Sequence, residues 1–340
     1  MNAARPADGA GVDASGLLAR LTDPVVRDLA WLLFSADLLR AHPPQAPLAE
    51  PWSDRAEAQA AALWLAQLDR DPTPLREALA ASHPTRLGRY AEILLDWFLE
   101  HGPALRLVAA NVPLRRAGRT LGECDFLVRT PDGRRLHWEL AVKCYLHTGN
   151  ASATLADFVG PNLRDRFDRK FAHLVDHQLR LSEREEFVSL GYPGPWLAQM
   201  LVKGWLFYPE GTFARADVID PPSIAPGHAR GWWVTRSEWS AFAAQQTADG
   251  WSVLQRLAWL SPRRIAAGKT GAPHSDIFSV RLSLTAPVDP EALLASLPCP
   301  DEPAMIAAFT ADSANGYAEH SRGFVVPDDW PARAQAFARE

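Results

Sequence analysis

Two acidic residues near the middle of the chain, Asp125 and Glu139, have residue types and a spacing that suit metal binding. They lie in residues 121–146 (LGECDFLVRTPDGRRLHWELAVKCYL), where apolar and polar side chains alternate in two runs separated by turn residues. The pattern predicts a β-hairpin with a core face and a charged face, and it places both acids on the charged face. The alternative interpretation is a hairpin whose charged face is simply solvated.

The turn of this predicted hairpin decides how the two acids meet. Pro131, Asp132 and Gly133 suit a three-residue connection in which the glycine takes the left-handed position. Counting back from that turn places Asp125 directly opposite Glu139, with Cβ atoms roughly 4.5–5.5 Å apart. Like charges at this separation repel, whereas a divalent cation between them is bound by both, and carboxylate oxygens favour Mg²⁺ or Mn²⁺. The sequence therefore predicts a Mg²⁺ or Mn²⁺ site at this pair.

A lysine follows on the same face of the second strand. The ammonium group of Lys143 is suited to stabilising charge on a phosphate or to positioning a water. Only four of the 35 basic residues are lysines, at positions 143, 170, 203 and 269, and two of them lie near the predicted site. Glu123 stands opposite Ala141 in the same register. It either supplies a further acid to the site or forms a structural ion pair with Lys143.

These features resemble the PD-(D/E)xK nuclease superfamily: a helix with a glutamate, a strand, a hairpin with Asp on one arm and Glu plus Lys on the other, and a following helix. The resemblance covers about residues 84–210, and the wider chain resembles the domain of unknown function 1853 family, thought to belong to that superfamily. It implies an α/β fold with a restriction-endonuclease-like core of helix, three strands, helix and strand. It also implies that Asp125 and Glu139 are the metal ligands, Lys143 the motif lysine, and Glu92, in the predicted helix at residues 87–101, the first-helix acid.

The chain departs from the superfamily's usual motif of acid, any residue and lysine, because Ala141 stands two residues before Lys143, where the acid is expected. Glu139 and Lys143 are four strand residues apart, which is about 13 Å, so they share one metal centre only if the strand bulges or the lysine leans back. For Glu92, the alternative is an exposed helix face on which it pairs with Arg89.

Residues 161–182 predict an amphipathic helix with cationic flanks. The side chains predicted to contact nucleic acid are Arg166, Arg169, Lys170, His177 and Gln178, and Gln178 interrupts the apolar stripe so that it is expected to point toward the metal site. In the comparable helix of RecB-type nucleases a Gln is followed four positions later by Tyr, where this chain has Ser182. The alternative is a surface helix whose cations are balanced by its own aspartates.

The charge distribution favours a polyanionic partner at the predicted site. Residues 106–184 have 14 basic and 9 acidic side chains, a net charge of +5, whereas residues 1–105 and 185–340 each have a net charge of −5. A positive central segment in an acidic protein is the charge pattern expected of a nucleic-acid-binding region. We expect this nucleic acid to be DNA.

Three regions are predicted along the chain: an N-terminal helical lead-in (residues 1–83), the nuclease-like core (84–210) and an α+β C-terminal extension (211–340). Outside the hairpin, helices are predicted at residues 17–40, 53–68, 73–81, 237–246 and 291–297, and strands at 105–114, 201–208, 231–235 and 276–284.

The remaining composition limits the compartment and the chemistry. Three cysteines imply no disulfide framework, and Cys124 and Cys144 are predicted to be buried thiols in a reducing cytoplasm. No segment has the length and apolarity of a signal peptide or a membrane span, so a cytoplasmic protein without a membrane partner is expected. Several of the 13 tryptophans concentrate in the C-terminal region, either as a base-stacking platform or as core anchors.

Together these features predict a metal-dependent phosphodiesterase that acts on DNA. Asp125 and Glu139 would bind the ion, Lys143 would position water or stabilise phosphate charge, and Glu123 or Glu92 would assist. The alternative is a catalytically inactive nuclease-fold protein that binds nucleic acid or a protein partner. The sequence does not specify the oligomeric state.

Overall fold

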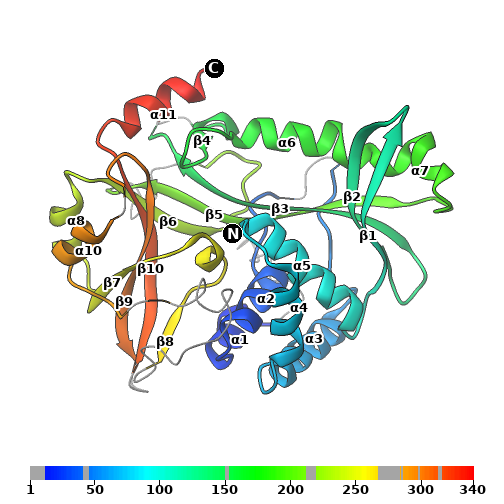
Figure 1. Cartoon of the computed structure of the whole chain (residues 1–340), viewed down its shortest axis with the longest axis horizontal. Helices are drawn as coiled ribbons and strands as arrows, with labels where there is room; N and C mark the ends of the chain where they lie inside the picture. Colours follow the sequence, from blue (N-terminus) through cyan, green and yellow to red (C-terminus); the bar gives the residue numbers. More distant parts are fainter. Residues whose placement is uncertain are drawn as a thin grey trace, which may run out of the picture.

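The computed structural model describes residues 12–40, 46–149, 153–211, 220–266, 284, 286–297, 299–312 and 316–340. Within them the chain forms a mixed α/β fold around one large sheet, with helices on both faces (Figure 1). None of the helices in these ranges is long and apolar enough to span a membrane.

Helices form the N-terminal region, as the sequence predicts. They are α1 (Ala14–Arg20), α2 (Pro24–Phe34), α3 (Arg55–Leu68) and α4 (Thr73–Ser82). The single helix predicted at residues 17–40 is wrong, because Asp23 caps a new helix by accepting bonds from the backbone N–H groups of Val25 and Val26. Proline is well suited to the first helical position that follows such a cap, and Pro24 occupies it.

The next elements follow the predicted order of helix, three strands, helix and strand. They are α5 (Leu87–His101), β1 (Arg106–Arg116), β2 (Arg119–Arg129), β3 (Arg135–His147), α6 (Phe167–Asp176) and β5 (Leu197–Pro209). Strands β1, β2 and β3 are antiparallel neighbours, and β5 lies parallel to β3. Between β3 and β5 lie the short elements η1 (Leu155–Asp157), β4 (Phe158–Val159), η2 (Gln178–Glu183) and α7 (Glu185–Ser189).

Helices cover both faces of this part of the sheet. Leu140 and Cys144 of β3 pack into the cluster that contains α2 and α5, whereas Ala141 and Tyr145 pack into the cluster that contains α6. The face of β3 expected to be charged is therefore largely buried, and the solvated-face interpretation is wrong for Glu139, which has no exposed surface. The buried thiols predicted at Cys124 and Cys144 are confirmed.

The sheet continues into the C-terminal region without a break. Its neighbouring strands run in the order β1-β2-β3-β5-β6-β10-β9-β7, so the predicted core and the predicted extension share one sheet through parallel pairing of β5 with β6. The elements of this region are β6 (Ala229–Thr235), α8 (Trp239–Gln245), β7 (Gly250–Val253), η3 (Arg256–Trp259), β8 (Arg264–Ala266), α10 (Pro290–Ser296), β9 (Ala304–Asp312), β10 (Gly316–Val326) and α11 (Trp330–Ala338). The strand predicted at 276–284 falls, apart from residue 284, outside the described residues. The sequence did not predict β7, β8, β9, β10 or α11.

Tryptophans of the C-terminal region are core anchors. Trp232, Trp239 and Trp251 are buried and pack with Phe242, with ring centroids 4.5 Å apart for Trp232 and Phe242 and 4.8 Å apart for Trp239 and Trp251. Trp233 is also buried. These rings present no face for a nucleic-acid base, so the base-stacking interpretation is wrong for them.

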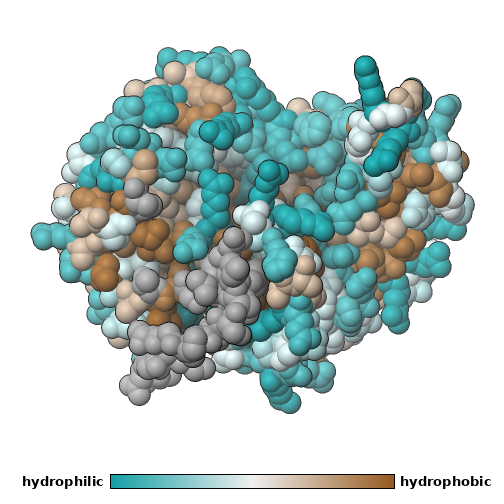
Figure 2. Space-filling view, viewed as in Figure 1, coloured by the Kyte–Doolittle hydropathy of each residue, from teal (hydrophilic) through white to brown (hydrophobic). Residues whose placement is uncertain are grey.

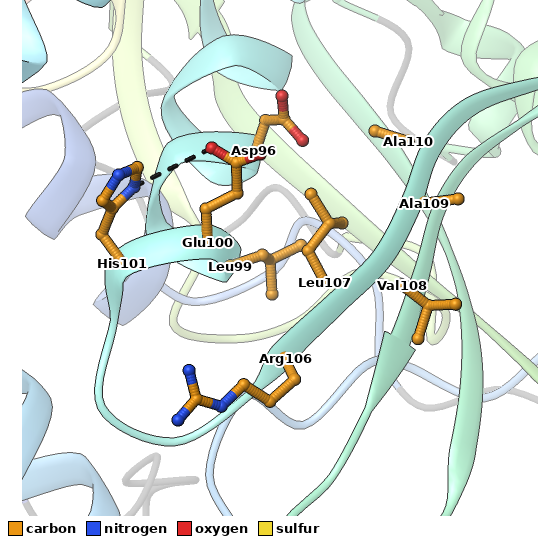
Figure 3. Close-up of a pocket in the computed structure, with 9 residues that line it drawn as sticks. All are labelled: Asp96, Leu99, Glu100, His101, Arg106, Leu107, Val108, Ala109 and Ala110. Carbon is orange, nitrogen blue, oxygen red and sulfur yellow. Dashed lines mark ion pairs between the residues drawn. The ribbon is translucent and has the colours of Figure 1, made fainter.

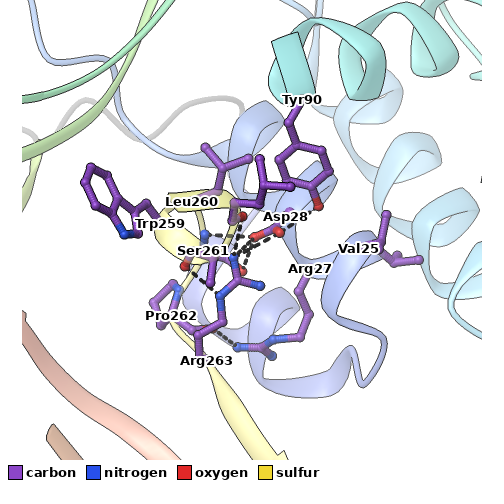
Figure 4. A network of polar contacts seen from close by, with 12 residues as sticks. Val25, Arg27, Asp28, Tyr90, Trp259, Leu260, Ser261, Pro262 and Arg263 are labelled. Atoms are coloured by element: carbon purple, nitrogen blue, oxygen red, sulfur yellow. Dashed lines mark hydrogen bonds and ion pairs between the residues drawn. The ribbon is translucent and has the colours of Figure 1, made fainter. Parts of the chain in front are cut away.

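A buried polar cluster joins the first helices to the C-terminal region (Figure 4). The carboxylate of Asp28 on α2 accepts hydrogen bonds from the Tyr90 hydroxyl (2.8 Å), from the hydroxyl and N–H of Ser261 (2.7 and 3.0 Å), and from the Arg263 guanidinium (3.0 Å). Asp28 has no exposed surface and Arg263 is 3% exposed. Because buried charges need partners, this cluster fixes α2 and α5 against the segment that follows η3.

Replacing Asp28 by alanine should leave the Arg263 guanidinium buried without its counter-charge. We expect the free energy of unfolding to fall by about 3–5 kcal/mol, measured by urea denaturation. The control is Arg333→Ala, which breaks an exposed ion pair with Asp329 and should cost less than about 1 kcal/mol. Equal losses in the two variants would show that the Asp28 cluster does not stabilise the fold.

Candidate functional site

The turn between β2 and β3 has the predicted three-residue form. Thr130 donates its N–H to the carbonyl of Arg134 (3.1 Å), Gly133 donates to the carbonyl of Thr130 (2.9 Å), and Gly133 has a φ of +88°. The register that follows pairs Phe126 with Trp138. Asp125 and Glu139 are the next residues on the two strands, and the N–H of Asp125 lies 3.3 Å from Glu139 Oε1, so the two acids lie close together as predicted.

The regular backbone pairing of β2 with β3 ends at Phe126 and Trp138. At the next residues, the carboxyl groups of the two acids accept hydrogen bonds from backbone N–H groups of the facing strand. The N–H of Asp125 points to Glu139 Oε1 (3.3 Å), and the N–H of Leu140 donates to Asp125 Oδ2 (2.9 Å). In β1, Asn111 adopts a left-handed conformation (φ +52°), which asparagine tolerates better than most residues. The ladder between β2 and β3 thus extends no further than Phe126 and Trp138, and at the acids two hydrogen bonds between these strands have side-chain acceptors.

Glu139 is the centre of a buried hydrogen-bond network. Its Oε1 faces Nε2 of His137 (2.8 Å), and its Oε2 accepts from Nε2 of Gln178 (2.6 Å). The other ring nitrogen of His137 faces the Ser182 hydroxyl (3.0 Å), and Lys170 Nζ donates to Gln178 Oε1 (2.9 Å). The network therefore runs from Ser182 through His137, Glu139 and Gln178 to Lys170, and Gln178 points toward the acids as the sequence analysis expected.

Burial disfavours charge at this network. It raises the pKa of Glu139 to about 8 and lowers the pKa of His137 to about 4. The pKa of Asp125 lies well above its ordinary value, first because of burial and then because of the neighbouring Glu139. A neutral His137 that donates from Nε2 and accepts the Ser182 hydroxyl at Nδ1 satisfies both of its bonds. The pKa of Asp125 thus depends on the charges of both neighbours, since Glu139 raises it and His137 lowers it.

Glu92 approaches the same acids from α5, on the other face of the sheet. It is half-buried and pairs with Arg89 (3.0 Å), which also donates to the side-chain oxygen of Asn111 (2.9 Å). The predicted pair with Arg89 is therefore present. The charge of Glu92 also raises the pKa of both Asp125 and Glu139, so this residue acts electrostatically on the site as well.

Lys143 forms its ion pair with Asp165 and not with Glu123. Its ammonium group pairs with the carboxylate of Asp165, which also accepts the Tyr145 hydroxyl (3.1 Å). The ion pair between Lys143 and Glu123 considered from the sequence is wrong, and Glu123 is an exposed residue whose charge raises the pKa of Glu139. The sequence pointed to Asp165 only as one of the aspartates of the predicted helix and not as the partner of Lys143, because the two residues are 22 positions apart and meet only through the fold.

The cationic segment that follows β3 is less regular than predicted. Helix α6 ends at Asp176, and a 3₁₀ turn continues from Gln178, so the helix predicted at residues 161–182 is too long. His177 has non-helical dihedral angles, and its Nε2 lies 2.9 Å from the carbonyl of Leu121. Leu181 follows on this turn and packs next to Gly122. The break places Gln178 against Glu139 and packs the 3₁₀ turn against the part of β2 that lies beyond its last ladder pair with β3.

Of the other side chains predicted to contact nucleic acid, Arg166 is bound to groups of the protein and Arg169 is exposed. Arg166 bonds to Asp168 (2.7 Å) and to the carbonyl of Ala338 (3.1 Å), so its guanidinium holds the end of α11. Arg169 is exposed, with its guanidinium 5.9 Å from the centre of the Phe337 ring.

A cavity lies elsewhere, between the end of α5 and β1 (Figure 3). Its volume is about 620 Å³, and its lining residues are Asp96, Leu99, Glu100, His101, Arg106, Leu107, Val108, Ala109 and Ala110. None of the predicted site residues lines it. In the described part of the chain, no group of three or more His, Cys, Asp or Glu side chains is arranged to hold a metal ion.

A family model for a domain of unknown function, DUF1853, matches residues 27–326. The chain belongs to this family. The matched region begins in α2, one residue before Asp28, and ends with the last residue of β10, so it includes the paired acids and the whole described sheet. No curated protein and no solved structure matches the chain.

The raised pKa of Glu139 predicts a pH-dependent stability. Between about pH 4.3, the pKa of an unfolded glutamate, and pH 8, the folded chain binds more protons at this residue than the unfolded chain does, so stability falls as pH rises. The lowered pKa of His137 acts in the opposite direction, but only below about pH 6.5. We expect the free energy of unfolding, measured by urea denaturation with a chelator, to fall by up to about 1.4 kcal/mol per pH unit between pH 6.5 and 8.

The variant Glu139→Gln should lose the part of this slope that comes from Glu139 and keep any part that comes from Asp125, whose pKa is also raised, whereas Glu100→Gln, which removes an exposed acid from α5, should keep the whole slope. An equally steep slope in wild type and Glu139→Gln would assign the titration to another group.

Proposed function

We propose that this protein is a Mg²⁺- or Mn²⁺-dependent phosphodiesterase that acts on DNA. The observation that supports it most directly is the proximity of Asp125 and Glu139 on adjacent strands, with the N–H of Asp125 3.3 Å from Glu139 Oε1, where partial or full burial raises the pKa of both acids. Two acids held together without a cation between them are unfavourable as anions, and a divalent ion removes that cost.

The surrounding architecture supports the same proposal. Helix α5 with Glu92, the antiparallel strands β1 to β3 with the acids on β2 and β3, helix α6 and the parallel strand β5 occur in the order of a PD-(D/E)xK nuclease core. The agreement concerns the order and direction of the longer elements, whereas Ala141 stands where the motif acid is expected. Fold similarity alone does not assign an activity, so the proposal rests on the acids.

The donor set fits a hard divalent ion. Asp125 and Glu139 would hold it through carboxylate oxygens, and Mg²⁺ in phosphate-handling sites is commonly bound by one or two carboxylates together with water and substrate oxygens. Such an ion would polarise a phosphoryl oxygen and lower the pKa of bound water. Glu92 would add negative charge from the opposite face, and Glu123, which is exposed on β2 two residues before Asp125, would also add negative charge.

The residues around the acids have separable tasks. His137 and Gln178 would orient the carboxylate of Glu139 through bonds of 2.8 and 2.6 Å. Arg169, exposed on α6, would attract the phosphate backbone, in agreement with the net charge of +5 over residues 106–184.

A second candidate is a protein of the same architecture that binds nucleic acid without cleaving it. Both oxygens of Glu139 already accept hydrogen bonds, Ala141 is buried where the motif acid is expected, and Lys143 is paired with Asp165. These contacts favour a closed site in which the acids serve structure.

A cleavage assay separates the two candidates. Labelled single-stranded and duplex DNA would be incubated with wild type, Asp125→Asn and Glu139→Gln in the presence of Mg²⁺, Mn²⁺ or a chelator. We expect metal-dependent cleavage by wild type and a loss of at least about 100-fold in both variants, because each removes a ligand worth several kcal/mol to the transition state.

Glu100→Gln is the matched control, since it also removes one acid and should cleave at the wild-type rate. Equal rates in wild type and Asp125→Asn would exclude catalysis at this site. Salt-sensitive DNA binding without cleavage by any variant would support the second candidate.

A further inference from the structure

The face of β3 and α6 that covers the paired acids contains two lysines, in a chain that otherwise uses arginine almost throughout. Lys143 was expected from the sequence to be the functional one. In the structure its ammonium group is paired with Asp165, and Tyr145 donates to the same carboxylate oxygen. Lys143 therefore belongs to a local ion pair between β3 and the segment that precedes α6.

Lys170 occupies a different position. It is half-buried on α6, and its ammonium group donates to Oε1 of Gln178 (2.9 Å), whose Nε2 donates to Oε2 of Glu139 (2.6 Å). Because an amide accepts at oxygen and donates at nitrogen, this bond fixes which way Gln178 is turned and aims its NH₂ group at Glu139.

Electrostatic effects agree with this geometry. Among the charges acting on Glu139, Lys170 is the cation that lowers its pKa, in opposition to Glu123 and Glu92. Burial and the charge of Lys143 lower the pKa of Lys170, whereas Asp125 and Glu139 raise it. Lys170 thus shares an electrostatic environment with both acids.

We propose that Lys170, rather than Lys143, is the lysine of the paired-carboxylate site, where it acts as a positioning residue that holds Gln178 against Glu139. This assignment rests on the proposed function for its kinetic consequence, but not for its location. The bond to Gln178 uses one of the three N–H donors of the Lys170 ammonium group. The remaining two N–H donors would lie on the same side of the sheet as a phosphate oxygen bound at the acids. Arginine is a poor substitute, because its planar fork does not reproduce a compact, flexible point charge.

Kinetics provide the first test. Lys170→Met should lower kcat for DNA cleavage by about 100-fold, as expected when one preorganised polar group is lost, and should leave KM unchanged. Lys170→Arg should recover part of the loss because it restores the charge. Lys143→Met should lower kcat less than Lys170→Met does, and Arg164→Met, which removes an exposed cation just before α6, should leave kcat unchanged.

A second test does not require activity. The chain has only four lysines, so protein labelled with ¹³C at the lysine Cε position gives a spectrum in which substitutions assign each signal. Added Mn²⁺ broadens nearby signals with a steep distance dependence. We expect the Lys170 signal to broaden at a lower Mn²⁺ concentration than the Lys143 signal. Thermal unfolding of each variant verifies that it is folded.

The outcomes distinguish this assignment from the proposed function. Earlier broadening of the Lys143 signal, or a larger loss of kcat in Lys143→Met than in Lys170→Met, overturns the assignment while the nuclease proposal remains. Earlier broadening of the Lys170 signal in a wild type that cleaves no DNA supports the assignment and overturns the catalytic proposal. Cleavage by wild type with neither signal broadened overturns the assignment alone.

Discussion

A carboxyl group with no exposed surface must form its hydrogen bonds with other groups of the protein. For Glu139 these donors come from β2, from β3 and from the turn that follows α6. The regular pairing of β2 with β3 stops next to Glu139, so that its oxygens and those of Asp125 accept backbone N–H groups in place of carbonyls. Helix α6 ends early, and the 3₁₀ turn that follows brings Gln178 within 2.6 Å. Because leaving such a group unpaired costs more than a local break in regular structure, the irregularities of β2, β3 and α6 have one common physical cause.

The parts of the chain far from the hairpin also determine the shape of the site. Tyr90, on the first turn of α5, donates to Asp28, and the same carboxylate binds Ser261 and Arg263. Glu92 follows Tyr90 by two residues on α5, so the orientation of this acid depends on a cluster built from α2 and the C-terminal region. The sheet links these regions as well, through the pairing of β5 with β6. The family match from residue 27 to residue 326 covers the cluster and the site together, which agrees with their forming one structural unit.

Two opposed requirements meet at the paired acids. A metal-binding site needs ionised carboxylates with accessible lone pairs, whereas burial raises the pKa of both acids and hydrogen bonds occupy both oxygens of Glu139. The two nearby lysines have different partners. Lys143 forms an ion pair with Asp165, whereas Lys170 donates to Gln178, which in turn donates to Glu139. The charge balance around Glu139, more than the presence of a lysine two residues after Ala141, therefore sets the ionisation state of this acid.

The sequence alone determined the hairpin, its three-residue turn and the meeting of Asp125 with Glu139, because strand alternation and turn geometry are local and fix the register between them. It also determined the order of the longer elements from α5 to β5, although η1, β4, η2 and α7 were not predicted. Only the tertiary structure decided that the second face of β3 is buried, that Lys143 meets Asp165, and that Ser182 and Lys170 belong to the network of Glu139. The tryptophans of the C-terminal region were likewise ambiguous until packing placed them in the core. These outcomes depend on contacts between residues distant in the chain, and the side-chain pattern along one strand does not encode which helix will cover it.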